Sequence, residues 1–436
     1  MKKNLNILLV EPRNELVITG GGGTAPLWPC VFSALTPKQH NLEFIHCSFE
    51  DINESKLRGH DLVGISSRTE TANHAYQIGD MCRKLKIPCI MGGIHPFALP
   101  DEAKQHCDSI VLGEAEYIWE TILEDAQRGK LKEVYKGEHT KPEDIPIPDK
   151  SILKKYRFKI ENVLETVRGC PYNCSFCCAT LYSGKKFRYR PISHILKEIE
   201  SWKKRRSLSI IADLNMTSSF DKAKEFFTAI IPYKLTWWGY ASINVAEDDE
   251  LLKLMSESGC VYLGIGFESV SKETLQEMNK KKNINTDYKE IIKKMHSYNL
   301  SLFGNFIFGM DTDTTDVFRE TAEFAIDTQI DFPVFQILVP YPGTKVYEKL
   351  EKDGRILTKD WSKYTRCDVV YQPKNMTREQ LIDGFFTAYE QVYSPKNRIK
   401  KLFSRWKGIK RNIYDQVLYL HFKKQYKMLQ KYHNRS

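Results

Sequence analysis

Short apolar runs alternate with helix-like stretches through most of this 436-residue chain, and no other feature constrains its fold as strongly. Apolar strands separated by amphipathic helices pack as parallel, doubly wound sheets. Residues 1–135 are therefore predicted to form an α/β domain of the Rossmann type. The strand candidates in it are Leu5–Val10, Leu42–Ile45, Leu62–Ile65, Pro88–Met91 and Ser109–Leu112.

A second α/β series follows residues 136–155, whose prolines and alternating charges predict a linker. Six β/α units over residues 156–345 predict a partial (β/α)6 barrel, with functional residues at the carboxyl ends of its strands. A C-terminal extension over 346–393 contains a predicted helix, Thr377–Tyr393. The six strand candidates are Asn162–Val167, Leu208–Ala212, Leu235–Ala241, Tyr262–Phe267, Leu302–Phe308 and Pro333–Val339.

The positive charge of the chain lies in its tail. The formal net charge is +10, and residues 394–436 hold 13 Lys and Arg against one acidic residue. Apolar residues recur there every three or four positions, which predicts a basic amphipathic helix. A membrane surface is the first expected partner, packing on the enzyme the second and nucleic acid the third, with a solvated helix as the alternative.

Cysteine content and hydropathy indicate where the protein works. Eleven cysteines are too few for a disulfide scaffold in a chain of this length, which favours a reducing compartment. No apolar run approaches the roughly 18 residues of a membrane span. We expect a cytoplasmic protein, with peripheral contact at the inner face of the membrane as a further expectation.

Three cysteines follow the first strand of the second series in the spacing C-x3-C-x2-C: Cys170, Cys174 and Cys177. Three thiolates on one loop can hold three irons of a four-iron, four-sulfur cluster and leave the fourth iron open. The alternative is a zinc site, which needs a fourth ligand. Cys178 is a poor candidate for it, because a residue adjacent to Cys177 must point away.

This spacing, with Phe176 before the last cysteine, resembles the signature of the radical S-adenosylmethionine (SAM) enzymes. The resemblance implies a [4Fe-4S] cluster, SAM cleavage to a 5′-deoxyadenosyl radical, and a reductant such as flavodoxin or ferredoxin. It also implies SAM contacts at the strand ends. These are Phe176, Asp213, Asn215, Ser242 and Glu268.

Two of these SAM contacts have further interpretations. Relatives often have Asp-Asp-Asn where this chain has Asp213-Leu214-Asn215, and a helix cap is an alternative role for Asp213. Glu268 follows Gly264 and Gly266, which are expected to let a ligand approach the backbone.

The first domain, placed ahead of such a barrel, resembles the cobalamin-binding domain of B12-dependent radical SAM enzymes. That resemblance implies cobalamin contacts at Ser66, Ser67, Gly92, Gly93 and Gly113. The Asp-x-His-x-x-Gly motif that supplies an axial histidine in many cobalamin proteins is missing, as it commonly is in these relatives. We do not expect His95 to bind cobalt. The glycine-rich loop Thr19–Thr24 is either a ligand loop or simply flexible.

The resemblance implies methylation of an unactivated carbon in a small-molecule, natural-product or lipid substrate. Catalytic residues are unknown, although Tyr341 at the end of the sixth strand is a candidate to face the substrate. Alternatives are a cyclase or oxidoreductase acting on a tetrapyrrole or lipid, an RNA-modifying enzyme, and a nonenzymatic cobalamin or metal carrier. We do not expect a nucleic-acid partner, because the cysteines of the first domain are scattered.

Overall fold

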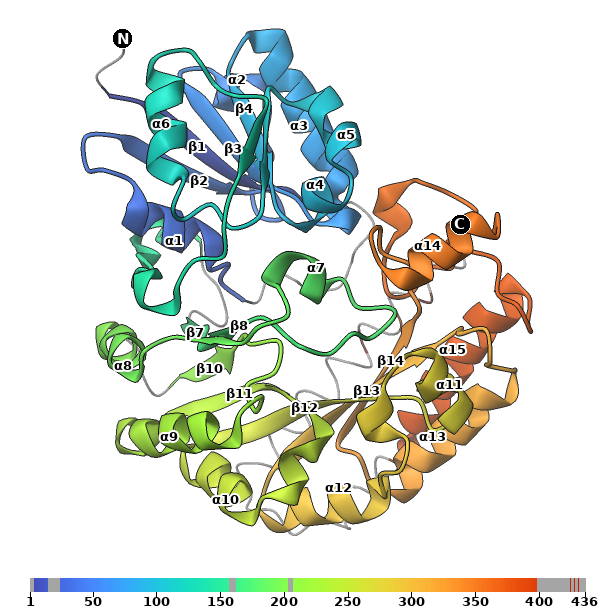
Figure 1. The fold of residues 1–436 in the computed structure, drawn as a ribbon. Coiled ribbons are helices and arrows are strands. Elements are labelled where there is room, and N and C mark those ends of the chain that lie inside the picture. The colour runs from blue at the N-terminus through green and yellow to red at the C-terminus, as the bar shows by residue number, and fades with distance from the viewer. Residues whose placement is uncertain are drawn as a thin grey trace.

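The computed structural model describes residues 4–14, 24–156, 162–202 and 207–397, together with residues 424, 427 and 430. Two six-stranded parallel sheets organise this part of the chain (Figure 1). The predicted ligand loop, except Thr24, and most of the basic tail lie outside the described residues. No described helix is both long and apolar enough to cross a membrane.

The N-terminal sheet has the strand order β2-β1-β3-β4-β5-β6. Its apolar strands form because helices cover both faces, so that β1 is buried along most of its length. All five predicted strands are confirmed within one or two residues, and β6 was not predicted. The strands are β1 (Asn6–Glu11), β2 (Asn41–His46), β3 (Leu62–Ser66), β4 (Cys89–Gly92), β5 (Ser109–Leu112) and β6 (Val134–Lys136).

Six helices accompany this sheet. The longest, α3, buries one face against the strands and ends at Lys86 in a left-handed conformation. The predicted linker that follows is folded onto the protein, since Thr140 and Ile145 within it are buried. The helices are α1 (Trp28–Leu35), α2 (Glu54–Leu57), α3 (Ala72–Leu85), α4 (Ile94–Ala98), α5 (Pro100–Ala103) and α6 (Trp119–Gln127).

The second sheet has the order β14-β13-β12-β11-β10-β7. Among the described residues its end strands β7 and β14 do not pair with each other, which confirms the open, six-stranded barrel. The predicted first strand is split into β7 and β8, and β8 pairs antiparallel with β9 outside the barrel sheet. The strands are β7 (Asn162–Leu164), β8 (Val167–Arg168), β9 (Arg188–Tyr189), β10 (Leu208–Ile211), β11 (Thr236–Ala241), β12 (Cys260–Glu268), β13 (Ser301–Phe308) and β14 (Phe332–Ile337).

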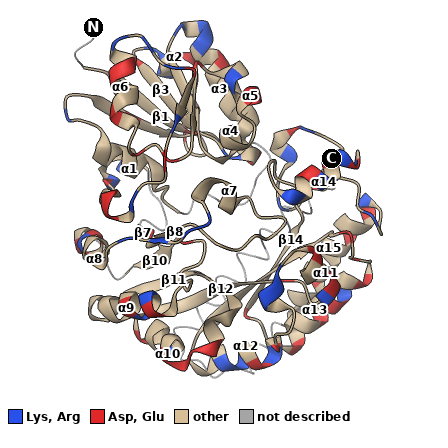
Figure 2. Ribbon diagram, viewed as in Figure 1, with Lys and Arg blue, Asp and Glu red and all other residues tan. Residues whose placement is uncertain are grey.

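Helices lie along the outside of this barrel, where Figure 2 shows acidic and basic residues side by side. Side-chain caps begin several of them as the acidic and hydroxyl starts predict; Asp248, for example, accepts from the Leu251 N–H. The outer helices are α8 (Ile192–Ser201), α9 (Phe220–Ile230), α10 (Asp249–Glu257), α11 (Lys272–Glu277), α12 (Tyr288–Ser297) and α13 (Asp316–Asp327). Helix α7 (Ala179–Ser183) lies instead between the barrel and the N-terminal body (Figure 1).

The C-terminal extension contains α14 (Lys345–Lys352) and α15 (Arg378–Val392). Helix α15 packs on β14 and α13, and the Tyr389 hydroxyl bonds both the N–H and the carbonyl of Phe335. The segment between the two helices reaches the N-terminal body, where the Trp361 indole donates to Glu102 at 2.6 Å. The extension thus connects both sheets.

Candidate active site

The cysteine loop lies between β8 and α7, and α7 contacts α4 of the N-terminal body (Figure 1). Cys170, Cys174 and Cys177 are all partly exposed. The Cys177 N–H donates to the Cys174 carbonyl at 3.2 Å, so the loop turns tightly between them. Each of the three thiols is near enough to the other two for their charges to interact. The loop therefore presents three thiols to one shared space.

The donor set fits a four-iron cluster better than a single ion. Among the described residues, no three His, Cys, Asp or Glu side chains converge closely enough to hold a metal ion, as tetrahedral zinc requires. A cluster spreads its thiolates around a cube instead. Burial raises the pKa of Cys174 to about 11, so iron would have to displace the thiol proton on binding.

A segment after α11 holds the cysteine loop in place. The Ser175 N–H donates to the Met278 carbonyl at 3.0 Å, and the Asn279 side-chain amide donates to the Asn173 carbonyl at 2.7 Å. Phe176 is partly buried and packs against the barrel core. These contacts fix the loop over the end of β12, so the barrel positions the thiols.

Glu268 ends β12 in a left-handed conformation, with φ of 65°, and its carboxylate accepts from the Lys280 ammonium at 2.7 Å. Burial acts to lower the pKa of Lys280, but the charges of Glu268 and Cys174 outweigh it and raise that pKa. Lys280 is therefore a cation beside the thiols. Sequence reasoning missed it, because a basic run after a helix also describes ordinary solvated surface.

The two glycines before Glu268 accommodate the protein's own side chains. A Cβ at Gly264 would collide with the ring of Tyr240, and one at Gly266 would collide with the Glu268 carboxylate. The expectation that they let a ligand approach the backbone is not met in this structure, since both positions are already covered.

Asp213 follows β10 and is 2% exposed. Its carboxylate accepts from the N–H groups of Thr166 and Val167, at 2.7 and 3.2 Å, and from the Thr166 hydroxyl. The helix-cap alternative is wrong, because Ser219 caps α9. Burial raises the pKa of Asp213 to about 7, and the bonds from Thr166 and Val167 limit the rise. Asp213 thus ties the end of β10 to the junction of β7 and β8, which leads into the cysteine loop.

Asn215 follows β10 and Ser242 follows β11, and the two residues are in contact. The Asn215 side-chain oxygen accepts from the Ser242 N–H at 3.1 Å. Its Nδ2 group is buried and has no hydrogen-bond partner among the described residues. A buried donor without a partner is costly, so this amide fits a position where a ligand oxygen completes the site. SAM, with its carboxylate and ribose oxygens, offers such acceptors.

The turns expected to contact cobalamin lie at the carboxyl edge of the N-terminal sheet. The Ser67 N–H donates to the Gly92 carbonyl at 2.8 Å, and a Cβ on Gly93 would approach the Ser67 carbonyl to 2.5 Å. Gly113, with φ of 99°, packs against Gly137 in the same way. Both glycines are thus required by chain packing, whereas a Cβ at Gly92 would make only an ordinary contact with Val111, at 3.6 Å.

His95 is fully buried and bonds the Tyr76 hydroxyl at 2.9 Å and the Thr69 hydroxyl at 3.3 Å. These partners occupy both ring nitrogens. The side chain is therefore an internal hydrogen-bonding group rather than an available cobalt ligand.

A cavity of about 600 Å³ separates the carboxyl ends of β1, β2 and β3 from β14 and the C-terminal extension. The cavity has room for a small organic molecule, and its described lining includes no residue of the cysteine loop. The predicted Ser66, Ser67 and glycine contacts do not line it. Its lining includes Glu11, His46, Arg68 and Glu70 on one side and Phe335, Tyr341, Tyr364, Arg366, Phe385 and Tyr389 on the other.

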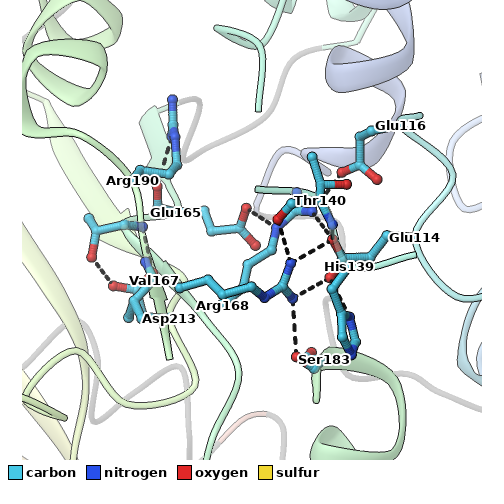
Figure 3. Close-up of polar contacts among 12 residues, drawn as sticks. Glu114, Glu116, His139, Thr140, Glu165, Val167, Arg168, Ser183, Arg190 and Asp213 are labelled. Carbon is cyan, nitrogen blue, oxygen red and sulfur yellow. Dashed lines mark hydrogen bonds and ion pairs between the residues drawn. The ribbon is translucent and has the colours of Figure 1, made fainter. Parts of the chain in front are cut away.

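A charged network joins the N-terminal body to the strands that flank the cysteine loop (Figure 3). Glu114, which is 3% exposed, pairs with Arg168 at 3.0 Å and with Arg188. Arg168 also pairs with Glu116 at 2.6 Å and Glu165 at 2.8 Å. Burial opposes ionisation of Glu114, but the two arginines lower its pKa to about 2. Sequence reasoning missed this network.

Comparison with known proteins shows what this arrangement is similar to. A family model described as the radical SAM superfamily matches residues 164–325, and a domain of unknown function, DUF4070, matches residues 344–433. Bacteriochlorophyllide d C-12(1)-methyltransferase of Chlorobaculum tepidum is 33% identical, over 91% of this chain and 89% of its own. The C-8(2)-methyltransferase of the same organism is 33% identical over 84% and 85%.

A solved structure shares the fold. It is the radical SAM methyltransferase TsrM from Kitasatospora setae with cobalamin and a [4Fe-4S] cluster bound, at a TM-score of 0.65 and 19% identity over 81% of this chain and 78% of that one. The chain belongs to the radical SAM enzymes, in the family of the bacteriochlorophyllide d methyltransferases.

Proposed function

We propose that Cys170, Cys174 and Cys177 hold the cluster, that Asn215, Ser242 and Lys280 contact SAM, and that the enzyme methylates an unactivated carbon of a small molecule. The observation that carries this is the position of three partly exposed thiols on one loop, near one another and beside Glu268 at the end of β12. The cofactors that we propose, a [4Fe-4S] cluster, SAM and cobalamin, would supply hydrogen abstraction and a transferable methyl group when bound. The protein's part is to hold and orient them.

Each proposed SAM contact has a specific physical role. The Lys280 cation lies beside the thiols, where it can pair with the SAM carboxylate. The unpartnered Asn215 amide donates to a ligand oxygen. Asp213 acts indirectly, because both of its oxygens already hold Thr166 and Val167. We therefore assign it a positioning role in place of the direct contact expected from the sequence.

The substrate occupies the cavity in this proposal. Methyl transfer is preferred to ring closure because both bacteriochlorophyllide d relatives at 33% identity are methyltransferases. A low-potential protein such as flavodoxin or ferredoxin supplies the electron. RNA modification by a second cluster is disfavoured, because all five cysteines of the first domain are buried in its packed core.

The function can be tested with anaerobically reconstituted enzyme, a reductant and SAM labelled in its methyl group. We expect 5′-deoxyadenosine from SAM, and label transferred to a compound in an extract of the source cells only when cobalamin is supplied. Absence of 5′-deoxyadenosine from cluster-loaded enzyme would refute the proposal. Its formation without any label transfer would favour ring closure or another radical reaction.

We also propose that the basic tail binds anionic membrane surfaces, on the basis of its charge and helical periodicity. Flotation with vesicles that contain phosphatidylglycerol tests this. The full chain should float with these vesicles and not with neutral ones, and deletion of residues 398–436 should abolish flotation. Equal flotation of the shortened chain would contradict the proposal.

A further inference from the structure

Arg366 extends from the C-terminal extension into the cavity between the two bodies. Its carbonyl accepts from the N–H of Ile337, the last residue of β14, at 2.8 Å. This bond fixes the residue at the carboxyl end of the barrel, where catalytic chemistry occurs in such folds. The segment belongs to the region matched by the domain of unknown function.

Four parts of the chain place side chains around the Arg366 guanidinium. The Tyr341 hydroxyl bonds it from beyond the end of β14, and its charge also acts on Tyr240 of β11, on Cys178 and on Glu70. Cys178 adjoins Cys177, one of the proposed cluster ligands. The guanidinium is therefore near enough to Cys178, the neighbour of that ligand, for their charges to interact.

Arg366 has no carboxylate partner in the described part of the chain. No ion pair to it forms there, although Glu70 is the acid whose charge reaches it. Glu70 already pairs with Arg68 at 3.5 Å, and Arg13, also at the cavity, pairs with Asp51. Three arginines and two glutamates line this space, and burial raises the pKa of Glu11, one of those glutamates. The lining thus has a surplus of positive charge.

The rest of the lining on this side is aromatic. Five rings contribute to it, and four of them belong to residues that are at most 9% exposed. A guanidinium beside such a surface suits a molecule that is apolar along its body and carries one planar anion, because the fork of N–H groups matches a carboxylate. The rings are those of Phe335, Tyr341, Tyr364, Phe385 and Tyr389.

We propose that Arg366 binds a carboxylate of the substrate, whose apolar body lies against these rings, and that this specificity is what the C-terminal extension contributes to the enzyme. The substrate class is thus an organic acid with an extended apolar or aromatic skeleton. A monoanion is favoured over a phosphate dianion because the cavity offers one unpaired guanidinium. The inference deepens the proposed function and rests on it.

A matched pair of probes tests this without knowledge of the substrate. 1-Pyrenebutyric acid and its methyl ester share one ring system and differ by one negative charge. Their affinities are measured by anaerobic calorimetry on protein loaded with cluster and cobalamin. We expect the wild type to prefer the acid by about tenfold, Arg366→Gln to lose this preference and Arg366→Lys to recover part of it. Lys374→Gln, an exposed charge change in the same extension, should behave as wild type.

The inference is overturned if Arg366→Gln retains the wild-type preference, or if the wild type binds the acid no better than the ester. SAM has a carboxylate of its own, so the affinity for SAM is measured in parallel. Arg366→Gln should bind SAM as tightly as the wild type. Weaker SAM binding would assign the guanidinium to SAM instead and refute the inference. Failure of the proposed function itself would be seen separately, as absence of 5′-deoxyadenosine in the wild type.

Discussion

At the scale of single residues, the adjacent cysteines Cys177 and Cys178 have different surroundings. Cys177 shares a space with two other thiols, whereas the adjacent Cys178 begins α7 and is next to the charges of Glu70 and Arg366. Burial raises the pKa of Cys178 to about 12 and that of Cys174 to about 11, so acidity does not distinguish Cys178 from the proposed cluster ligands. Their positions do.

This contrast predicts the result of two serine substitutions. Cys177→Ser should lose iron, acid-labile sulfide and nearly all 5′-deoxyadenosine formation, because the cluster loses one of three protein ligands. Cys178→Ser should keep the wild-type iron content. Iron and sulfide analysis of anaerobically reconstituted proteins measures both. Equal iron loss in the two variants would show that Cys178 is a ligand and would change the assignment.

At the scale of elements, the loop after β5 is joined to the β8–β9 hairpin by Glu114 (Figure 3). The hairpin flanks the cysteine loop, so the network sets its position relative to the N-terminal sheet. The lowered pKa of Glu114, about 2, also has a consequence for stability. Its contribution is complete above the unfolded pKa of about 4.5 and is lost as the pH falls from there to about 2.

Glu114→Gln should lower the free energy of unfolding by about 3 kcal/mol at pH 7, because it leaves two partly buried arginines without their shared carboxylate. The difference from wild type should shrink as the pH falls below about 4.5. Urea unfolding over this pH range measures it. Glu124→Gln is the control, since its pair with Arg128 is exposed and should change stability by less than about 0.5 kcal/mol. Similar losses in both variants would contradict the proposed role.

At the scale of the whole molecule, the C-terminal extension connects the two bodies across the cavity. Trp361 bonds Glu102 of α5, and the Asn73 side chain of α3 donates to Asp360 at 2.7 Å. The same extension supplies Arg366. The two sheets are thus held in relation to each other by the segment that also completes the cavity wall.

Trp361→Phe should lower the free energy of unfolding by about 1–2 kcal/mol, because it removes a hydrogen bond to a carboxylate while it retains most of the ring packing. Chemical unfolding at neutral pH measures the loss. Tyr298→Phe removes a similar bond, from an exposed hydroxyl to Asp249, and should cost less than about 0.5 kcal/mol. A Trp361→Phe loss no larger than the control would show that this bond does not connect the bodies.

Most of the parallel strands and the position of the cysteine loop could be predicted from the sequence, because they depend on the local pattern of apolar residues and on residue spacing. The alternation of apolar runs and helices predicted eleven of the parallel strands, and the spacing of the cysteines predicted the loop. Strand β6 was missed, because Val134–Lys136 is short and adjoins a segment rich in prolines. The split between β7 and β8 was missed as well, since one strand was predicted across Asn162–Val167 although Glu165 and Thr166 interrupt its apolar residues.

Sequence alone determined the two α/β bodies, the position of the cysteine loop and the family. The periodicity of apolar residues and the spacing of the cysteines can be recognised without knowledge of the fold. Only the tertiary structure decided what Lys280, Glu114 and Arg366 do. Each is a charged residue that reads as ordinary surface, and each acquires its partners from elements distant in the chain. Burial and neighbouring charge, which set these roles, arise only when the sheets and the extension pack together.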